Sequence, residues 1–159
     1  MAGISSAGVS ISYSVEATTG VRPLTLAVFT KVAEVKTIPE IASIPATADA
    51  TTLDNLISTS AIDTLVDVGG AVEVLALLND SVLTAWETAI TAYTTGQISA
   101  LDTWWCVQIP GMTDSFYFIA KPVVAGLNTV EVQSVLFQKL ALIITEDITG
   151  WKAKPTPTA

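Results

Sequence analysis

Residues 102–122, DTWWCVQIPGMTDSFYFIAKP, constrain the fold of this chain more than any other stretch. The alternating apolar residues on either side of a Pro-Gly pair predict two short strands joined by a turn. In the first arm Trp105 and Val107 point to one face, while Trp104 and Cys106 point to the other, and the return arm repeats this pattern. A hairpin usually keeps one face in water. Both faces of this one are apolar, so each needs a cover.

The composition suggests that much of the surface meets other protein. The chain has 159 residues, which favours one domain with a substantial core. Half of the residues are hydrophobic and only 14% are charged, whereas about 25% is typical of soluble proteins. This number of charged residues is low for the surface of a free monomer.

The charged and nucleophilic residues exclude several classes of function. The net charge is −8 and the isoelectric point is near 4.2, which argues against a protein that grips DNA phosphates with lysine and arginine. It does not exclude a surface along which DNA passes unbound. The single cysteine cannot form an intrachain disulfide, and the absence of histidine excludes a Ser-His-Asp or Cys-His pair. We expect no enzyme activity and no cofactor, although the absence of histidine does not exclude a carboxylate-based hydrolase.

Membrane insertion and export are not expected. No run of about 18 apolar residues is present to span a bilayer as a helix. The first residues, MAGISSAGVSISYSVEA, have neither the basic start nor the apolar centre of a secretory signal. Synthesis and assembly in the host cytoplasm are the expectation.

The hydrophobic pattern predicts a mainly β fold, a β-sandwich or barrel, with one helix. Leu83, Trp86, Ala89, Ile90 and Tyr93 share one helical face. Asn79 or Asp80 is the expected N-cap and Gly96 the expected C-terminal cap. The predicted elements are a strand at 9–16 with a polar face that includes Glu16, a strand region at 24–38, a long loop at about 39–60, a strand at 62–78, a helix at about 80–94, the 102–122 hairpin, and an 18-residue strand at 129–146.

Other candidate reactive or binding residues have simpler interpretations. Cys106 lies in a strand without a nearby basic group, which is typical of an inert, buried thiol. Asp63 and Asp67 would lie about 13 Å apart on a strand. We interpret this pair, and the adjacent Glu146-Asp147, as solvated acidic residues rather than a catalytic or metal site. Trp104-Trp105 cannot form one stacking platform, because neighbouring residues point to opposite faces of a strand.

The order of four segments resembles the major tail tube protein of long, non-contractile (siphovirus-type) phage tails. FTKVAEVKTIPEIASIPATADATTLD (29–54) resembles that family's strand and polar loop. AVEVLALLNDSVLTAWETAITAYTTG (71–96) resembles its strand and helix. DTWWCVQIPGMTDSFYFIAKPVVAGLN (102–128) resembles its W-x-I-P-G hairpin, with Ala-Lys-Pro where the family often has glycine. TVEVQSVLFQKLALIITED (129–147) resembles its closing strand.

The resemblance implies a structural virion protein. Family members form hexameric rings that stack into a hollow tube, through which DNA passes without specific binding. It implies one tail-tube domain at 1–151 followed by a flexible Pro/Thr tail at 152–159. The implied partners are further copies of the chain, the tail tip and tail terminator proteins, and a tape measure protein inside the lumen. A neighbouring subunit would then cover the second face of the apolar hairpin.

Two sets of residues follow as hypotheses. Polar strand positions would line the lumen and repel phosphates. The 39–60 loop would contact the next ring and become ordered on assembly. The lumen set is Glu34, Asp63, Asp67, Glu131 and Gln133, in which Glu131 with Gln133 and Asp63 with Asp67 are predicted same-face pairs. The stacking set is Pro39, Ile41, Pro45, Asp49 and Asp54.

Two other classes of function remain open at this stage. A monomeric ligand- or carbohydrate-binding β-sandwich would show aromatic residues on one exposed strand face and more surface charge. A carboxylate-based hydrolase would need two acids at catalytic spacing.

Overall fold

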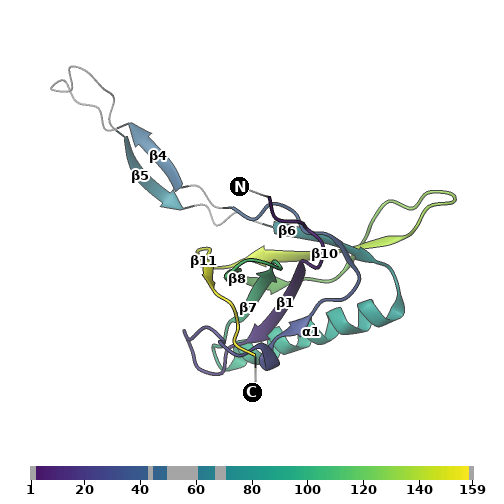
Figure 1. Cartoon of the computed structure of the whole chain (residues 1–159), viewed down its shortest axis with the longest axis horizontal. Coiled ribbons are helices and arrows are strands. Elements are labelled where there is room, and N and C mark those ends of the chain that lie inside the picture. The colour runs from purple at the N-terminus through teal and green to yellow at the C-terminus, as the bar shows by residue number, and fades with distance from the viewer. Residues whose placement is uncertain (1–2, 43–44, 50–60, 67–70, 158–159) are drawn as a thin grey trace.

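The computed structural model describes residues 3–42, 45–49, 61–66 and 71–157. The prediction of a mainly β fold with a single helix is confirmed for these residues (Figure 1). The elements are β1 (Ser10–Val15), a 3-10 helix (Leu26–Val28), β2 (Thr30–Lys31), β3 (Val35–Thr37), β4 (Pro45–Asp49), β5 (Ala61–Val66), β6 (Ala71–Leu77), α1 (Asp80–Ile98), β7 (Thr103–Gln108), β8 (Asp114–Pro122), β9 (Gly126–Leu127), β10 (Phe137–Ile144) and β11 (Gly150–Ala153).

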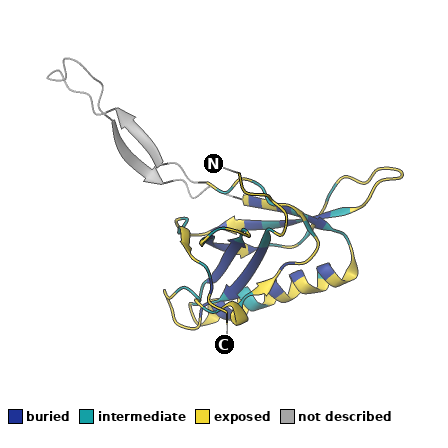
Figure 2. Ribbon diagram, in the orientation of Figure 1, coloured by how far each residue is buried: buried dark blue, intermediate teal, exposed yellow. Residues whose placement is uncertain are grey.

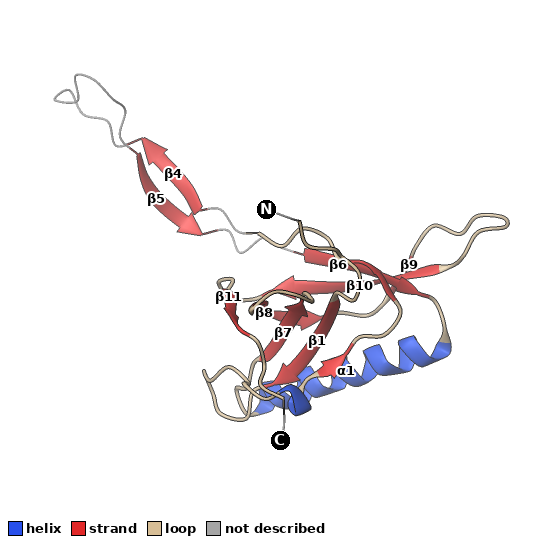
Figure 3. Ribbon diagram, viewed as in Figure 1, coloured by secondary structure: helices blue, strands red, loops and turns tan. Residues whose placement is uncertain are grey.

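The main sheet has nine strands and curls into a half-barrel (Figure 3). Its path runs β2-β1-β7-β8-β10-β6-β3, with β11 paired to β8 and β9 paired to β10. The curl occurs at β8, because residues 116–119 pair with β7 whereas residues 120–122 pair with β10. The helix α1 lies along one side of this sheet, over its apolar face (Figure 1).

The first face of the β7–β8 hairpin forms the centre of the core. Trp105 is fully buried between Tyr13 and Trp86, with ring centroids 5.2 Å and 5.6 Å away. Its indole Nε1 donates a hydrogen bond to the carbonyl oxygen of Ala120 at 3.1 Å. Phe118 lies opposite Trp105 in the strand register. The predicted assignment of the two hairpin faces is confirmed.

The second face of the hairpin is covered by the chain's own segments. Trp104, Cys106, Tyr117 and Ile119 form a separate buried cluster against which Phe29 packs. The cover is completed over Tyr117: the Arg22 guanidinium carbon lies 4.6 Å from the ring centroid, and the hydroxyl donates to the Ala153 carbonyl oxygen at 2.8 Å. The expectation that a neighbouring subunit covers this face is therefore wrong.

The described part of the predicted flexible tail, residues 152–157, makes backbone hydrogen bonds with the rest of the chain. Strand β11 continues through Ala153, and Pro155 is buried. The Thr156 amide donates to the Leu24 carbonyl oxygen at 2.8 Å, and the Leu26 amide donates to the Thr156 carbonyl oxygen at 2.9 Å. The segment thus secures the same part of the chain that covers Tyr117.

Three predicted β elements differ from the structure. The 18-residue strand at 129–146 is wrong, because β10 begins only at Phe137 and residues 129–136 form an exposed loop. The region 24–38 contains two short strands and a 3-10 helix rather than one long strand. The predicted strand at 62–78 is divided between β5 and β6. Strand β5 pairs with β4, which lies within the predicted 39–60 loop, as a two-stranded ribbon away from the main sheet (Figure 1).

The helix follows its prediction closely at the N-terminus and less closely at the C-terminus. The side-chain oxygen of Asn79 accepts a hydrogen bond from the Val82 amide at 2.9 Å, as an N-cap should. Val82, Trp86 and Ala89 are buried on the core side. Gly96 is not the cap. It is a buried helical residue whose added Cβ would lie 2.9 Å from a Val15 methyl group, so glycine is needed for close packing.

Ala100, just beyond the helix, provides a test of backbone strain. Its φ is +55°, the left-handed conformation that glycine adopts without a Cβ clash. We expect Ala100→Gly to raise the free energy of unfolding by about 0.5–1 kcal/mol, after allowing for the greater freedom of glycine in the unfolded chain. Urea denaturation would measure the change. Ala85→Gly, on the exposed side of α1, should instead lower stability by about 1 kcal/mol; equal losses in both variants would contradict the strain.

Candidate functional site

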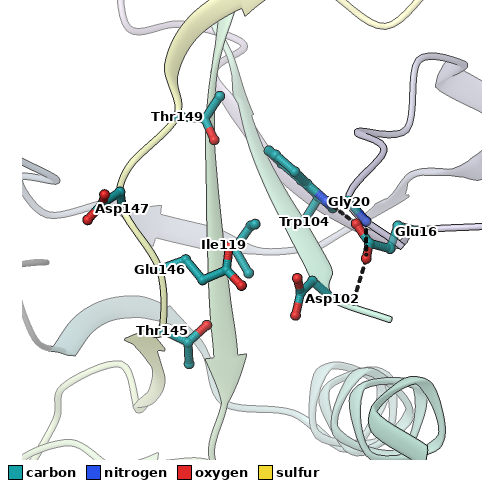
Figure 4. Close-up of a pocket in the computed structure, with 9 residues that line it drawn as sticks. All are labelled: Glu16, Gly20, Asp102, Trp104, Ile119, Thr145, Glu146, Asp147 and Thr149. Atoms are coloured by element: carbon teal, nitrogen blue, oxygen red, sulfur yellow. Dashed lines mark hydrogen bonds between the residues drawn. The ribbon is translucent and has the colours of Figure 1, made fainter. Parts of the chain in front are cut away.

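An acidic pocket lies between the end of β1 and the segment that follows β10. Its volume is about 550 Å³. Figure 4 shows that carboxylates from several chain segments surround the pocket. The lining residues are Glu16, Gly20, Asp102, Trp104, Ile119, Thr145, Glu146, Asp147 and Thr149.

Glu16 is the buried carboxylate of this pocket. Its side chain accepts three hydrogen bonds: from the Gly20 amide at 3.0 Å, the Asp102 amide at 3.1 Å and the Trp104 indole at 2.9 Å. Burial alone raises the pKa of a carboxyl group, but these donors favour the charged form and outweigh it. The pKa of Glu16 therefore lies below its ordinary value. Its carboxylate joins the end of β1 to the start of β7.

Glu146 is shifted in the opposite direction. Desolvation and the neighbouring carboxyl groups of Asp102, Glu16 and Asp147 raise its pKa. Like charges close together disfavour ionisation, and a proton shared with a neighbouring acid relieves the repulsion. The predicted solvated pair Glu146-Asp147 is indeed exposed. The sequence did not reveal that Glu16 and Asp102 would lie beside it, since they are far apart in the chain and carry no motif.

We expect Glu146→Gln to stabilise the protein at neutral pH. A carboxyl group whose pKa is raised by folding weakens the fold above its unfolded pKa of about 4.3 and has no such effect once it is protonated in both states. The melting temperature of the variant should therefore exceed that of the wild type at pH 7, and the difference should vanish below about pH 4. Glu87→Gln, on the exposed face of α1, is the control. A gain that persisted in acid would exclude carboxylate repulsion as its cause.

Among the described residues, no group of three or more Cys, Asp or Glu side chains is placed to hold a metal ion. Burial raises the pKa of the Cys106 thiol, which keeps it in the unreactive protonated form. The best-placed carboxylate of the pocket, Glu16, is occupied by backbone and indole donors.

No helix in the described part of the chain is long and apolar enough to cross a membrane.

The described lumen residues lie in three separate parts of the chain. Glu34 lies in a bend between β2 and β3 with φ +58°. Glu131 and Gln133 lie in the exposed 129–136 loop, where Gln133 has φ +62°, so their predicted pairing on one strand face is wrong. Asp63 lies on β5, apart from the main sheet, and Asp67 falls outside the described residues.

The predicted stacking residues lie on and before the β4–β5 ribbon. Pro45 and Asp49 are the two ends of β4, and Asp54 falls outside the described residues. Pro39 and Ile41 are half-buried in the segment that leads to the ribbon, and Ile41 packs against the main core. Their role in stacking stays a prediction.

The outward face of β6 and β10 was missed as a candidate surface. In both strands buried residues alternate with more exposed ones (Figure 2). Glu73 and Lys139 lie on this face with their charged groups 3.5 Å apart, and Lys121 of the adjacent β8 is also exposed. The sequence signal was weak, because Glu73 is the only polar residue in AVEVLAL and the alternation appears only in the burial of these residues.

No protein-family model matches this chain, and a search of curated proteins finds no match.

Comparison with solved structures does find the same fold. A chain in the six-fold symmetrised cryo-EM structure of the anti-feeding prophage (AFP) baseplate is similar with a TM-score of 0.58 and 11% identity, covering 92% of this chain and 94% of that one. A chain in the tail of an empty GTA particle, refined helically with C6 symmetry, is similar with a TM-score of 0.54 and 10% identity, covering 89% of this chain and 94% of that one. At such low identity the likeness establishes the fold alone.

Proposed function

We propose that this chain is a structural subunit of a phage tail or a related particle, and that it forms six-membered rings that stack into a hollow tube. The main support is its fold, which extends over nine-tenths of the chain and is shared with subunits of two six-fold symmetric assemblies. The four segments that resemble siphovirus-type tail tube proteins favour the non-contractile subclass. A non-enzymatic role agrees with the acidic pocket, where the Glu16 carboxylate already accepts hydrogen bonds from two backbone amides and an indole.

Open strand edges support the assembly. Strand β3 pairs with β6 only near Leu75 and Ala76, so the β6 backbone from Ala71 to Val74 has no described partner on that side. At the other end of the sheet, β2 has only two residues. Open edges can accept a strand from another chain, and closing a ring of half-barrels would remove them. We propose that the sheets of neighbouring subunits join in this way.

The outward face of β6 and β10 is our proposed channel wall. It carries Glu73, Lys139 and Lys121, a mixed set that offers no continuous basic surface to DNA. The net charge of −8 further disfavours phosphate binding. DNA would pass without specific binding, and a tape measure protein would occupy the lumen before ejection.

The β4–β5 ribbon is the proposed contact between successive rings. It is a separate two-stranded sheet that lies away from the body (Figure 1). An isolated two-stranded hairpin is marginally stable in water. We propose that it becomes fixed against the next ring, and that tail tip and terminator proteins occupy the same surfaces at the two ends of the tube, in a virion assembled in the host cytoplasm.

The binding-module alternative is less well supported. A carbohydrate platform needs several aromatic rings on one exposed face. Within the described residues, Trp151 is the only strongly exposed aromatic residue, and its ring contacts Phe116 edge-on at 5.4 Å.

Negative-stain electron microscopy of the concentrated protein, together with size-exclusion chromatography, tests the proposal. We expect rings or hollow tubes with regular axial striations. A protein that stays a monomer at every concentration and binds a soluble glycan would favour the binding-module function instead.

A further inference from the structure

The loop between β9 and β10 extends away from the sheet, and its residues 129–136 are all exposed (Figure 2). It carries three exposed valines: Val130, Val132 and Val135. The side chain of Val132, at the turn, is 93% exposed. Isolated apolar residues on a surface are normal, but several on one projecting loop mark a contact site. The only charged residue in this loop is Glu131.

An apolar groove lies at the other end of the sheet. Its volume is about 260 Å³, and its lining side chains include Ile38, Ile41, Ile109, Phe116 and Trp151. Four of these residues pack against the main core, so the groove is an open extension of it. Trp151 forms one wall and remains 48% exposed. Groove and loop are therefore both apolar, and in the single chain both leave apolar side chains exposed to solvent.

The size and chemistry of the groove favour protein side chains as its occupants. Small-molecule pockets usually measure about 300–1,000 Å³ and carry a few convergent polar groups. This groove is smaller, and the side chains that line it are aliphatic, aromatic or proline. A short apolar segment of protein meets these conditions.

The loop and the groove cannot meet within one chain. Trp151 lies on β11, and Figure 3 shows β11 at one end of the main sheet and the β9–β10 loop at the other. A protrusion and a matching recess at opposite ends of one molecule define a head-to-tail contact, which closes into a ring when the rotation between copies allows it.

We propose that the β9–β10 loop of one copy inserts its valines into the Ile109–Trp151 groove of the next copy. This contact rests on the proposed ring assembly and gives the ring its direction. It adds a side-chain contact to the backbone pairing of sheet edges. Two features otherwise unexplained, the exposed valines and the open groove, then have the same cause.

Cross-linking tests the contact directly. In the double variant Val132→Cys/Ile109→Cys, a short bismaleimide should produce a covalent ladder that ends at six subunits. Each single variant alone should give no ladder, and an equimolar mixture of the two should give dimers. The native Cys106 is fully buried and should not react. The control pair is Ile98→Cys/Ile109→Cys, because Ile98 is 85% exposed but belongs to neither surface.

A charge substitution provides the second test. Val132→Asp should raise the concentration needed for half-maximal assembly by at least about tenfold, since it would bury a charge in an apolar groove. Ile98→Asp should leave that concentration unchanged. In wild-type assemblies Trp151, the only strongly exposed tryptophan, should become protected from acrylamide quenching.

The outcomes separate this contact from the proposed function. Rings that form without the cross-linked ladder, or that tolerate Val132→Asp, would overturn the loop-in-groove contact and leave the ring proposal intact. A protein without rings, ladder or Trp151 protection at any concentration would overturn both.

Discussion

Replacing Trp105 with alanine should lower the free energy of unfolding by about 3–5 kcal/mol, the range observed for large aromatic residues truncated in protein cores. Its indole is fully buried and lies between the rings of Tyr13 and Trp86. Truncation would leave a cavity at the junction of β1, β7 and α1, and would remove the donor to the Ala120 carbonyl. Small domains have only about 5–15 kcal/mol of net stability, so this loss would be a large fraction of the total.

The control for this experiment is Trp151→Ala. It removes the same side chain at a half-exposed position, so urea denaturation of the monomer should show a loss of at most about 1.5 kcal/mol. Comparable losses in the two variants would mean that Trp105 is not at the centre of the core.

Glu16→Ala should lower stability at neutral pH by about 3 kcal/mol. Glu16 is only 1% exposed, and its removal leaves the Trp104 indole and the Gly20 and Asp102 amides without their acceptor. Buried donors without a partner are costly, especially when the lost acceptor was charged. Glu16→Gln keeps the shape and one carbonyl oxygen, so its loss should be smaller. Glu87→Ala, on the helix surface, should change stability by less than about 0.5 kcal/mol.

The pH dependence of the Glu16 effect has a defined sign. Folding lowers the pKa of this carboxyl group. Its stabilisation is therefore present above the unfolded pKa of about 4.3 and is lost as the pH falls through the lower folded value. The difference between wild type and Glu16→Ala should be largest at neutral pH and should shrink towards about pH 3. Urea titrations at several pH values measure it. A difference that grew in acid would contradict the hydrogen-bond account.

Local patterns predicted the elements that depend on local chemistry. The helix was predictable because Asn79 caps it and Trp86 and Ala89 recur at helical spacing on its buried side. The hairpin was predictable because strict alternation fixes which side chains share a face, and Trp105 and Phe118 are paired as this requires. Both signals lie within about 20 residues of chain and need no knowledge of distant contacts.

Features that depend on distant contacts were not predictable in the same way. The segment TVEVQSVL alternates like a strand, but its backbone turns at Gln133. The valines of this segment are exposed, so they do not contribute to the core of the single chain. The cover over Tyr117 comes from Arg22 and Ala153, which are more than a hundred residues apart in the sequence. The acidic pocket likewise brings Glu16 beside Glu146. No local hydrophobic pattern in the sequence predicts contacts between residues so far apart in the chain.

Cryo-EM reconstruction of the assembled protein, with its symmetry determined rather than imposed, tests the central proposal most directly. We expect rings of six 16.6-kDa subunits, with the outward face of β6 and β10 lining the channel and the β4–β5 ribbon contacting the next ring. A channel wall formed by α1, a different ring number, or particles without a channel would contradict it.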